Sequence, residues 1–371
     1  MGNRKKNKLI NIDNWVSDPI NINRVLMPNN MIMSYDQTLN PIKISDDYII
    51  SERVNDMRRA AEVHRQARRY LQKNLKVGMK YIDVCQMVEN KVIDTFGRND
   101  LVAGMGFPVG FSVNNITAHD SANPGDERVV EYNDVIKIDF GTHYNGNIID
   151  SAFTAAFNPK YKPLLDSTKD ATWAGIKLMG PDALIQDIST EILEVIESYE
   201  IELDGNIYPI RSVTNLGGHT IEPYIIHAGK LVLCGPNKMV DQNWRMNVGE
   251  CYAIETFAST GKGNVVNDYN SLCNHYMKNK NHQKVNFKLN TTKKLYSFIT
   301  KTRKTLPFCT RWLEQDFGTN YQLALKELNE NNVVTSYPPL IDKIGTYTSQ
   351  LEHTIYMHEF GKEVLSTGDD Y

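Results

Sequence analysis

The most constraining feature of this sequence is a pair of β-rich segments joined by Asn145-Gly146, in the stretch VIKIDFGTHYNGNIIDSAFTAAF. Asn-Gly is the strongest short-range signal for a two-residue hairpin turn, because both residues readily adopt a positive φ. If these two residues form the turn, Tyr144 lies opposite Asn147 and the register of the whole hairpin is fixed. The sequence therefore predicts an antiparallel hairpin in which every cross-strand pair can be named.

This register places two aspartates on one face of the hairpin. Asp139 faces Ala152 and Asp150 faces Gly141, and the alternation of side chains turns all four toward one side, with the aspartates about 7–8 Å apart at the backbone. A pair of acids on a hairpin is usually part of a solvated polar face. Here apolar residues flank the pair on both strands: Ile136, Ile138, Phe140, Ile148, Ile149 and Phe153. Buried carboxylates are costly without a cation, so we expect these acids to bind metal.

Three histidines offer further ligands or catalytic groups. His219 and His227 lie in TNLGGHTIEPYIIHAGK, where Gly217-Gly218 permits a close approach of the backbone, and His119 lies in the turn-rich segment NNITAHDSANPGD. Each histidine taken alone is more often a packed or surface residue than a ligand. Carboxylates together with one imidazole nevertheless suit a pair of divalent cations, which lower the pKa of bound water.

A fainter internal repeat occurs later in the chain. The segment IETF, which contains Glu255, resembles IDF around Asp139, and LEHT, which contains Glu352, resembles IDSA around Asp150. The repeat predicts a second half-sheet whose two carboxylates face the first pair across a pseudo-two-fold axis. Because Glu255 and Glu352 are far apart in sequence, the second hairpin must be interrupted by an insertion, which we place at 276–337.

The insertion contains the strongest local charge in the sequence. From Lys278 to Lys304 there are nine Lys and Arg residues and no Asp or Glu. A solvated face of surface helices is the simpler interpretation, and docking to RNA or another acidic surface is the alternative.

The rest of the chain divides into an N-terminal extension, 1–45, and a body, 46–371. The extension is rich in Asn, Ile and Pro without a clear period. From Ser51 onward apolar residues recur at three- and four-residue steps, and Gly97 is suitably placed to cap a second helix. Four helices are expected in the body: one from Ser51 to about Leu75, one over Ile82–Phe96, and two at about 164–179 and 183–199.

Composition excludes several classes of protein. A net charge of −3 over 371 residues gives no global signal for a nucleic-acid or membrane partner. The five cysteines form no CxxC pair and are odd in number, which argues against a disulfide framework and for a reducing compartment. No apolar run is long enough to serve as a signal peptide or a membrane span, so we expect a cytoplasmic protein with no membrane association.

Five motifs in order resemble one family. GFPVGFSVNNITAHD, KIDFGTHYNGNIIDSAF, NLGGHTIEPYIIHAGK, YAIETFASTGKG and YTSQLEHTI are similar to motifs of the type 2 methionine aminopeptidases, from about residue 50 to the closing GDDY. The resemblance implies an α+β pita-bread fold, the creatinase/aminopeptidase fold, with two pseudo-symmetric half-sheets covered by helices. It also implies a helical insertion subdomain, 276–337, within the catalytic domain. The segment after His119 departs from the family pattern, since Asp120-Ser121-Ala122-Asn123 replaces Tyr-Thr-Pro-Asn.

The family resemblance implies roles for particular residues. The ligands of a dinuclear metal centre fall on Asp139, Asp150, His219, Glu255 and Glu352, with Co, Mn, Fe or Zn as the cations. Glu255 would also act as general base, His227 would stabilise the oxyanion, and His119 would hydrogen-bond the scissile amide. The walls of the methionine pocket fall on Phe107, Ile226, His275 and Tyr337, for which an ordinary core role is an equal alternative.

The resemblance further implies removal of the initiator methionine from nascent proteins whose second residue is small. The expected partners are nascent N-termini, with the ribosome surface as a further candidate, and the enzyme is expected to act as a monomer. Two rivals stay open. One is an X-Pro aminopeptidase or prolidase, which has the same fold and ligand types. The other is a catalytically dead pita-bread scaffold that binds RNA or proteins through the basic insertion.

Overall fold

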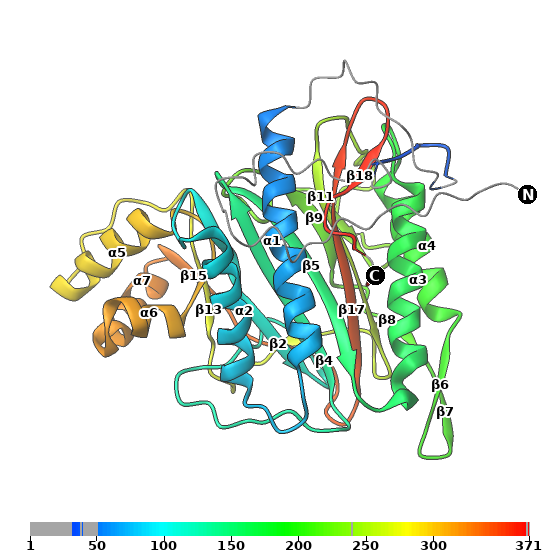
Figure 1. Ribbon diagram of the computed structural model, residues 1–371, viewed down its shortest axis with the longest axis horizontal. Helices are drawn as coiled ribbons and strands as arrows, with labels where there is room; N and C mark the ends of the chain where they lie inside the picture. The colour runs from blue at the N-terminus through cyan, green and yellow to red at the C-terminus, as the bar shows by residue number, and fades with distance from the viewer. Residues whose placement is uncertain (1–31, 38, 40–50, 239, 369, 371) are drawn as a thin grey trace, which may run out of the picture.

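The computed structural model describes residues 32–37, 39, 51–238, 240–368 and 370 (Figure 1). Its first half-sheet has the strand order β2-β4-β5, with β2 at Ala103–Val113, β4 at Val135–Tyr144 and β5 at Asn147–Ala156. Asn145 and Gly146 both have positive φ, 50° and 81°, as a type I′ turn requires.

The predicted register of this hairpin is confirmed. Tyr144 pairs with Asn147, Asp139 with Ala152, and Gly141 with Asp150. A two-residue turn between two alternating strands thus sets the register that places both aspartates on one face.

The second half-sheet is larger and is assembled from distant segments. Its strands follow the order β1-β18-β17-β11-β9-β10, with β8 paired to β11. The strands span Ile32–Met33 (β1), Lys362–Val364 (β18), Thr348–Met357 (β17), Cys251–Ser259 (β11), Gly217–Ile221 (β9), Leu231–Leu233 (β10) and Arg211–Ser212 (β8). At its centre Glu255 lies directly opposite Glu352. The predicted 1–45 extension lies mostly outside the described residues, and its described part includes β1, which pairs with β18.

The two half-sheets meet along β5 and β17, which are joined by side chains. The Asp150 amide donates to Thr354 Oγ1 (2.8 Å), and Ser151 Oγ donates to the Glu352 carbonyl oxygen (2.8 Å). At this seam between β5 and β17, hydrogen bonds of side-chain hydroxyl groups therefore take the place of the backbone-to-backbone hydrogen bonds of a continuous sheet. Because the seam joins Asp150 to the strand of Glu352, it brings the acids of both halves together.

Helices cover both half-sheets, as predicted. Figure 1 shows α1 and α2 lying over the β2-β4-β5 sheet, and α3 and α4 beside the second half-sheet. They span Glu52–Asn74 (α1), Tyr81–Phe96 (α2), Lys162–Leu178 (α3) and Ile185–Glu197 (α4). Gly97 ends α2 in the left-handed conformation (φ 69°), and Ser51 caps α1. Separate apolar clusters fill the space under each helix pair.

A smaller unit lies between β11 and β17 in sequence, at the left of Figure 1. It contains the helices α5 (Asn290–Thr302), α6 (Thr310–Phe317) and α7 (Gln322–Glu330), with the 3-10 helix η5 (Thr319–Tyr321). These pack with a small sheet of order β14-β13-β15, at Phe308–Cys309, His275–Lys278 and Val334–Tyr337. His275 pairs with Tyr337 where the unit joins the body, so both ends of the insertion meet at one point.

The remaining elements are short. They are β3 (Ile116–Ala118), β12 (Val266–Asn267), β16 (Leu340–Ile341), β6 (Glu200–Leu203), β7 (Asn206–Pro209) and the 3-10 helix η4 (Pro159–Tyr161). Within the described residues, none of the helices combines the length and apolar character needed to span a membrane.

Candidate metal centre

Five side chains predicted as metal ligands converge between the two half-sheets. Asp150, His219 and Glu352 place ligand atoms within 4.8 Å of one another, and so do Asp139, Glu255 and Glu352. Glu352 belongs to both groups. Two overlapping sets of three ligands, joined by a shared carboxylate, can hold two neighbouring cations.

His219 is placed by the backbone of β9. It pairs with Leu231 on one side and Ala253 on the other, and its Nε2 lies 3.5 Å from Asp150 Oδ2 and 3.8 Å from Glu255 Oε1. A Cβ on Gly218 would lie 2.1 Å from the Ala253 carbonyl oxygen, so only glycine lets β9 approach β11 this closely. The Gly-Gly pair seen in the sequence therefore positions the histidine that follows it.

Several carboxylate oxygens of the site lack hydrogen-bond partners, and a cation could bind them. Asp139 Oδ1, Asp150 Oδ1 and Glu352 Oε2 are buried and have no hydrogen-bond partner among the described residues. Burial raises the pKa of Asp139 to about 6, and burial plus neighbouring carboxylates raises the pKa of Glu352 well above its usual range. Crowded buried acids with orphaned oxygens fit divalent metal ions, whose positive charge removes both costs.

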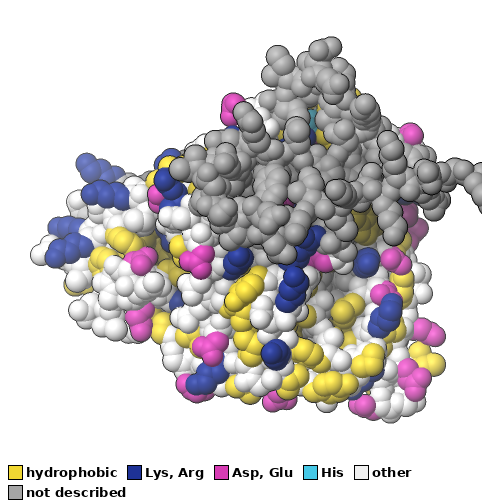
Figure 2. Space-filling model, viewed as in Figure 1, with side chains coloured by type: hydrophobic (Ala, Val, Ile, Leu, Met, Phe, Trp, Pro, Cys, Tyr) yellow, Lys and Arg dark blue, Asp and Glu magenta, His cyan; other side chains and the backbone are white. Residues whose placement is uncertain are grey.

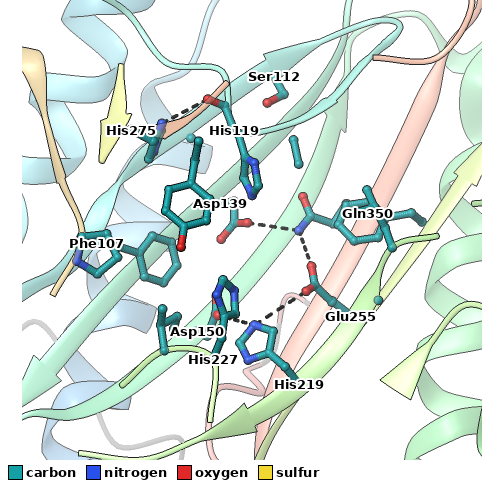
Figure 3. Close-up of a pocket in the computed structure, with 18 of the residues that line it drawn as sticks. Phe107, Ser112, His119, Asp139, Asp150, His219, His227, Glu255, His275 and Gln350 are labelled. Carbon is teal, nitrogen blue, oxygen red and sulfur yellow. Dashed lines mark hydrogen bonds and ion pairs between the residues drawn. The ribbon is translucent and has the colours of Figure 1, made fainter. Parts of the chain in front are cut away.

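The centre opens into a cavity of about 430 Å³ (Figure 3). Carboxylates and imidazoles occupy one side of it, and apolar side chains occupy much of the rest. The predicted site residues that line the cavity are Phe107, His119, Asp139, Asp150, His219, Ile226, His227, Glu255, His275 and Tyr337. A space of this size is typical of a small-ligand site.

Phe107 shows how the backbone shapes the apolar wall. It pairs with Gly141 across β2 and β4, and a Cβ on Gly141 would lie only 2.3 Å from the Phe107 ring. The ring therefore lies over Gly141, which has no side chain and neighbours both Asp139 and Asp150 on this face of the hairpin. The two aspartates and this part of the apolar wall thus lie on neighbouring strands of one sheet.

Three histidines lie around the cavity without forming part of the two ligand groups. The ring centroids of His227 and His219 are 4.4 Å apart, and those of His119 and Tyr337 are 5.6 Å apart, both edge-to-face. His275 Nδ1 lies 3.1 Å from the His119 carbonyl oxygen. The predicted substrate-contacting residues are therefore neighbours in space although they come from four separate segments.

These imidazoles are neutral near pH 7. Burial, with a smaller repulsion from His227, lowers the pKa of His119 to about 4, and burial lowers the pKa of His227. Burial together with His119 lowers the pKa of His275 to about 3. Neutral rings retain one lone pair and one N–H, so each can both accept and donate a hydrogen bond.

One residue that the sequence patterns did not single out bridges the two halves. Gln350 Nε2 donates to Asp139 Oδ2 (3.1 Å) and to Glu255 Oε2 (3.2 Å), as Figure 3 shows. A signal for it exists, because Gln350 lies two residues before Glu352 on a predicted strand and must share its face. Asn215 and Met277 also line the cavity and have no distinguishing signal in the sequence.

Comparison with known proteins identifies relatives. Residues 55–280 match the model of metallopeptidase family M24. The chain is 47% identical over 317 residues to methionine aminopeptidase 2A of Arabidopsis thaliana, covering 85% of this chain and 71% of the relative. It is 46% identical over 341 residues to methionine aminopeptidase 2-2 of Chaetomium globosum, covering 90% and 76%.

Solved structures share the fold at low identity. An Arx1 from a thermophile has a TM-score of 0.73 at 18% identity, covering 87% of this chain and 93% of that one. A methionine aminopeptidase from Thermotoga maritima has a TM-score of 0.57 at 18% identity, covering 86% and 98%. An X-Pro aminopeptidase from the same organism has a TM-score of 0.51 at 14% identity, covering 87% and 63%. These likenesses support the pita-bread architecture expected from the sequence.

Proposed function

The chain belongs to metallopeptidase family M24, among the type 2 methionine aminopeptidases, and on that basis we propose how its cavity works. It is a metal-dependent hydrolase that removes the initiator methionine. The observation that carries the assignment of its site is the pair of three-ligand groups that share Glu352 beside an apolar cavity. The other four ligands, Asp139, Asp150, His219 and Glu255, line this cavity, next to the space that a substrate would occupy.

Asp139, Asp150, His219, Glu255 and Glu352 would hold two divalent cations. The cations would supply Lewis acidity and a lowered pKa for bound water near neutral pH. Oxygen-rich ligands with a single imidazole accept Mn, Fe, Co or Zn, so the ligand set leaves the native metal open. Gln350 fixes the orientations of Asp139 and Glu255, because its one amide nitrogen donates to both.

The apolar part of the cavity would take the methionine side chain. Phe107, Ile226, His275 and Tyr337 all line it, and each comes from a different segment. The His275 Nδ1–H points to the His119 carbonyl and to Asn274 Oδ1, so that nitrogen is already satisfied within the protein. A long unbranched thioether suits such a mixed aromatic and aliphatic wall.

Proton handling would fall to Glu255, His119 and His227. Glu255 belongs to the second ligand group, where its carboxylate can take a proton from the attacking water and deliver it to the leaving amine. The neutral His227 can donate to the oxygen that becomes negative in the transition state. His119, whose ring packs edge-to-face against Tyr337, can hydrogen-bond the scissile amide.

The cavity should also limit the second residue of the substrate. The α-amine and the scissile bond must both reach the acid cluster, which leaves little room for the next side chain. Small residues such as Gly, Ala, Ser, Thr and Val should be accepted, and Lys, Leu or Phe should be rejected.

Peptide turnover tests this function. Met-Ala-Ser should be cleaved, whereas Met-Lys-Ser and an X-Pro peptide should not. Activity should disappear on chelation and return with Mn²⁺, Fe²⁺, Co²⁺ or Zn²⁺. Equal rates on Met-Ala-Ser and Met-Lys-Ser would contradict the proposed selectivity, preferential cleavage of the X-Pro peptide would favour the prolidase alternative, and no cleavage of any peptide by the metal-loaded protein would favour the scaffold alternative.

We also propose a cytoplasmic monomer that meets nascent chains at the ribosome surface. Seven basic side chains of the insertion are exposed: Lys280, Lys284, Lys288, Lys293, Lys294, Lys301 and Lys304. Figure 2 shows Lys and Arg side chains gathered at the outer end of this unit. Docking to phosphate-rich RNA predicts ribosome co-sedimentation that weakens steeply with salt. Co-sedimentation unaffected by Lys293→Glu with Lys294→Glu would contradict the use of this face.

A further inference from the structure

His119 lies in a backbone conformation that its own side chain disfavours. Its φ is +66°, in the left-handed region, which costs of order 1 kcal/mol or more for a residue other than glycine. Such a residue persists only where its surroundings hold it. The segment that follows, Asp120-Ser121-Ala122-Asn123, is also where the sequence departs from the family pattern, and two sets of charged contacts hold it in place.

The first restraint is an ion pair beneath the loop. Asp120 is 4% exposed, and its Oδ2 lies 2.6 Å from Arg128 Nη1. Arg128 Nη2 also donates to the Ser121 carbonyl oxygen (3.2 Å), and the guanidinium is itself held by Asp126 (2.7 Å). Asn274 Nδ2 donates to the same Ser121 carbonyl from the other side (2.8 Å).

The second restraint comes from the insertion. Arg311, near the start of α6, donates to Ser121 Oγ (2.8 Å) and to the Ala122 carbonyl oxygen, and it pairs with Glu89 of α2. Arg311 and Glu89 are each 5% exposed. Thr310 Oγ1 donates to Asn123 Oδ1 (2.8 Å). Two guanidinium groups thus satisfy the buried carbonyls of the loop that begins at His119.

We propose that Arg128 and Arg311 are positioning residues that hold the His119 loop in its strained conformation, so that the imidazole meets the scissile amide. Figure 3 shows His119 pointing into the cavity with its carbonyl held by His275. Without the guanidinium groups, the buried Ala122 carbonyl loses its donor and the Ser121 carbonyl keeps only Asn274, so the loop can relax toward an unstrained backbone. The proposal rests on the role given to His119 above.

Arg128→Gln is the direct test, because Arg128 is partly exposed whereas Arg311 is buried. On Met-Ala-Ser peptide we expect kcat to fall about 10- to 100-fold, the scale of a misplaced catalytic group, with KM and metal content unchanged. Arg128→Lys should recover part of the rate, since it keeps one contact to Asp120. Arg98→Gln is the matched control: its pair with Asp100 (3.7 Å) is about half exposed and touches no loop residue.

A double-mutant cycle separates positioning from general structural damage. His119→Ala should lower the rate about 10²–10⁴-fold with metals retained, and adding Arg128→Gln to it should lower the rate no further. Arg311 is tested with the double variant Glu89→Gln, Arg311→Gln, which leaves no lone buried charge. The loss of rate that it causes should likewise disappear when His119 is replaced by Ala.

The outcomes are distinct. Equal losses from Arg128→Gln in the presence and absence of His119, or no loss with His119 present, would overturn the positioning proposal alone. Wild-type turnover by His119→Ala would overturn the role of His119 itself and, with it, this proposal.

Discussion

The two half-sheets present their acids in different ways. In the β4–β5 hairpin, Asp139 and Asp150 are diagonal neighbours, each paired with a small residue. In the second half-sheet, Glu255 and Glu352 are direct cross-strand partners. One pair is set by a two-residue turn, whereas the other is brought together across the whole insertion. Local contacts therefore place the aspartate pair, and long-range strand pairing places the glutamate pair.

The difference has an energetic consequence. Like charges directly opposite on neighbouring strands are destabilising, and a diagonal arrangement relieves part of that repulsion. The Glu255–Glu352 pair should therefore depend more on cations than the aspartate pair does. Side-chain hydroxyl bonds between β5 and β17 force both pairs to share one site. Four experiments can test whether the two halves differ in this way.

The largest effect is expected from removing one acid of either half. Asp150→Ala and Glu352→Ala should each abolish turnover of Met-Ala-Ser peptide and lower the metal content, because each carboxylate belongs to a three-ligand group that nothing else completes. Metal analysis and peptide kinetics would measure both. Glu359→Ala, an exposed acid just beyond β17, is the control. Two metals per chain and near-wild-type turnover in either variant would contradict the ligand set.

The turn of the first half should be the most sensitive point for folding. Gly146→Ala should lower the free energy of unfolding by about 2–4 kcal/mol, since φ is +81° and the new Cβ would lie 2.3 Å from the Tyr224 ring. Gly205→Ala is a matched control with φ +79° and open space around it, and should cost only about 1 kcal/mol. Urea unfolding would measure both. Equal costs would show that the packing of Tyr224 is irrelevant.

The facing glutamates should weaken the metal-free protein. Burial raises the pKa of Asp139 to about 6, and the pKa of Glu352 is raised well above its usual range by burial and neighbouring carboxylates. The folded state then binds these protons more tightly than the unfolded chain does. Stability is therefore fullest below about pH 4, where the unfolded chain also holds its protons, and falls as the pH rises through 6 and beyond.

Glu352→Gln should consequently stabilise the metal-free protein at pH 7 by at least about 1.4 kcal/mol, the value of one pKa unit. Asp139→Asn should gain less, because Asp139 has no acid directly opposite and its pKa is raised only to about 6. Thermal melts of chelator-treated protein at pH 5 and pH 7 would measure this, with Glu359→Gln as the exposed control. An equal or larger gain from Asp139→Asn would mean that facing and diagonal acids do not differ in their effect on stability.

The smallest effect is expected in the insertion that separates the two glutamates. Four Gly or Ser residues added between Gln283 and Lys284, both exposed and outside helices and strands, should change the free energy of unfolding by less than about 1 kcal/mol. Peptide turnover should be unchanged. A larger loss would mean that long-range pairing of β11 with β17 depends on the length of this connection.

Much of the local structure could be predicted. Apolar periodicity and Gly97 placed α2 within one residue of its observed bounds, and Asn145-Gly146 predicted the hairpin register without error. The small sheet β14-β13-β15 inside the insertion was not anticipated, because its strands are only two to four residues long. Such segments carry too few residues for an alternating pattern to be recognised. The roles of the individual site residues stay predictions until variants are measured.

The amino-acid sequence alone specifies which strands carry the acids and which way those side chains face, because turn geometry and alternation act over neighbouring residues. It also carries enough of the family's motifs to name the expected ligands. Three features emerge only from the tertiary structure: Gln350 joins Asp139 to Glu255, Phe107 lies over Gly141, and two arginines hold the loop of His119. Those contacts join residues from distant parts of the chain, and packing rather than local preference selects them.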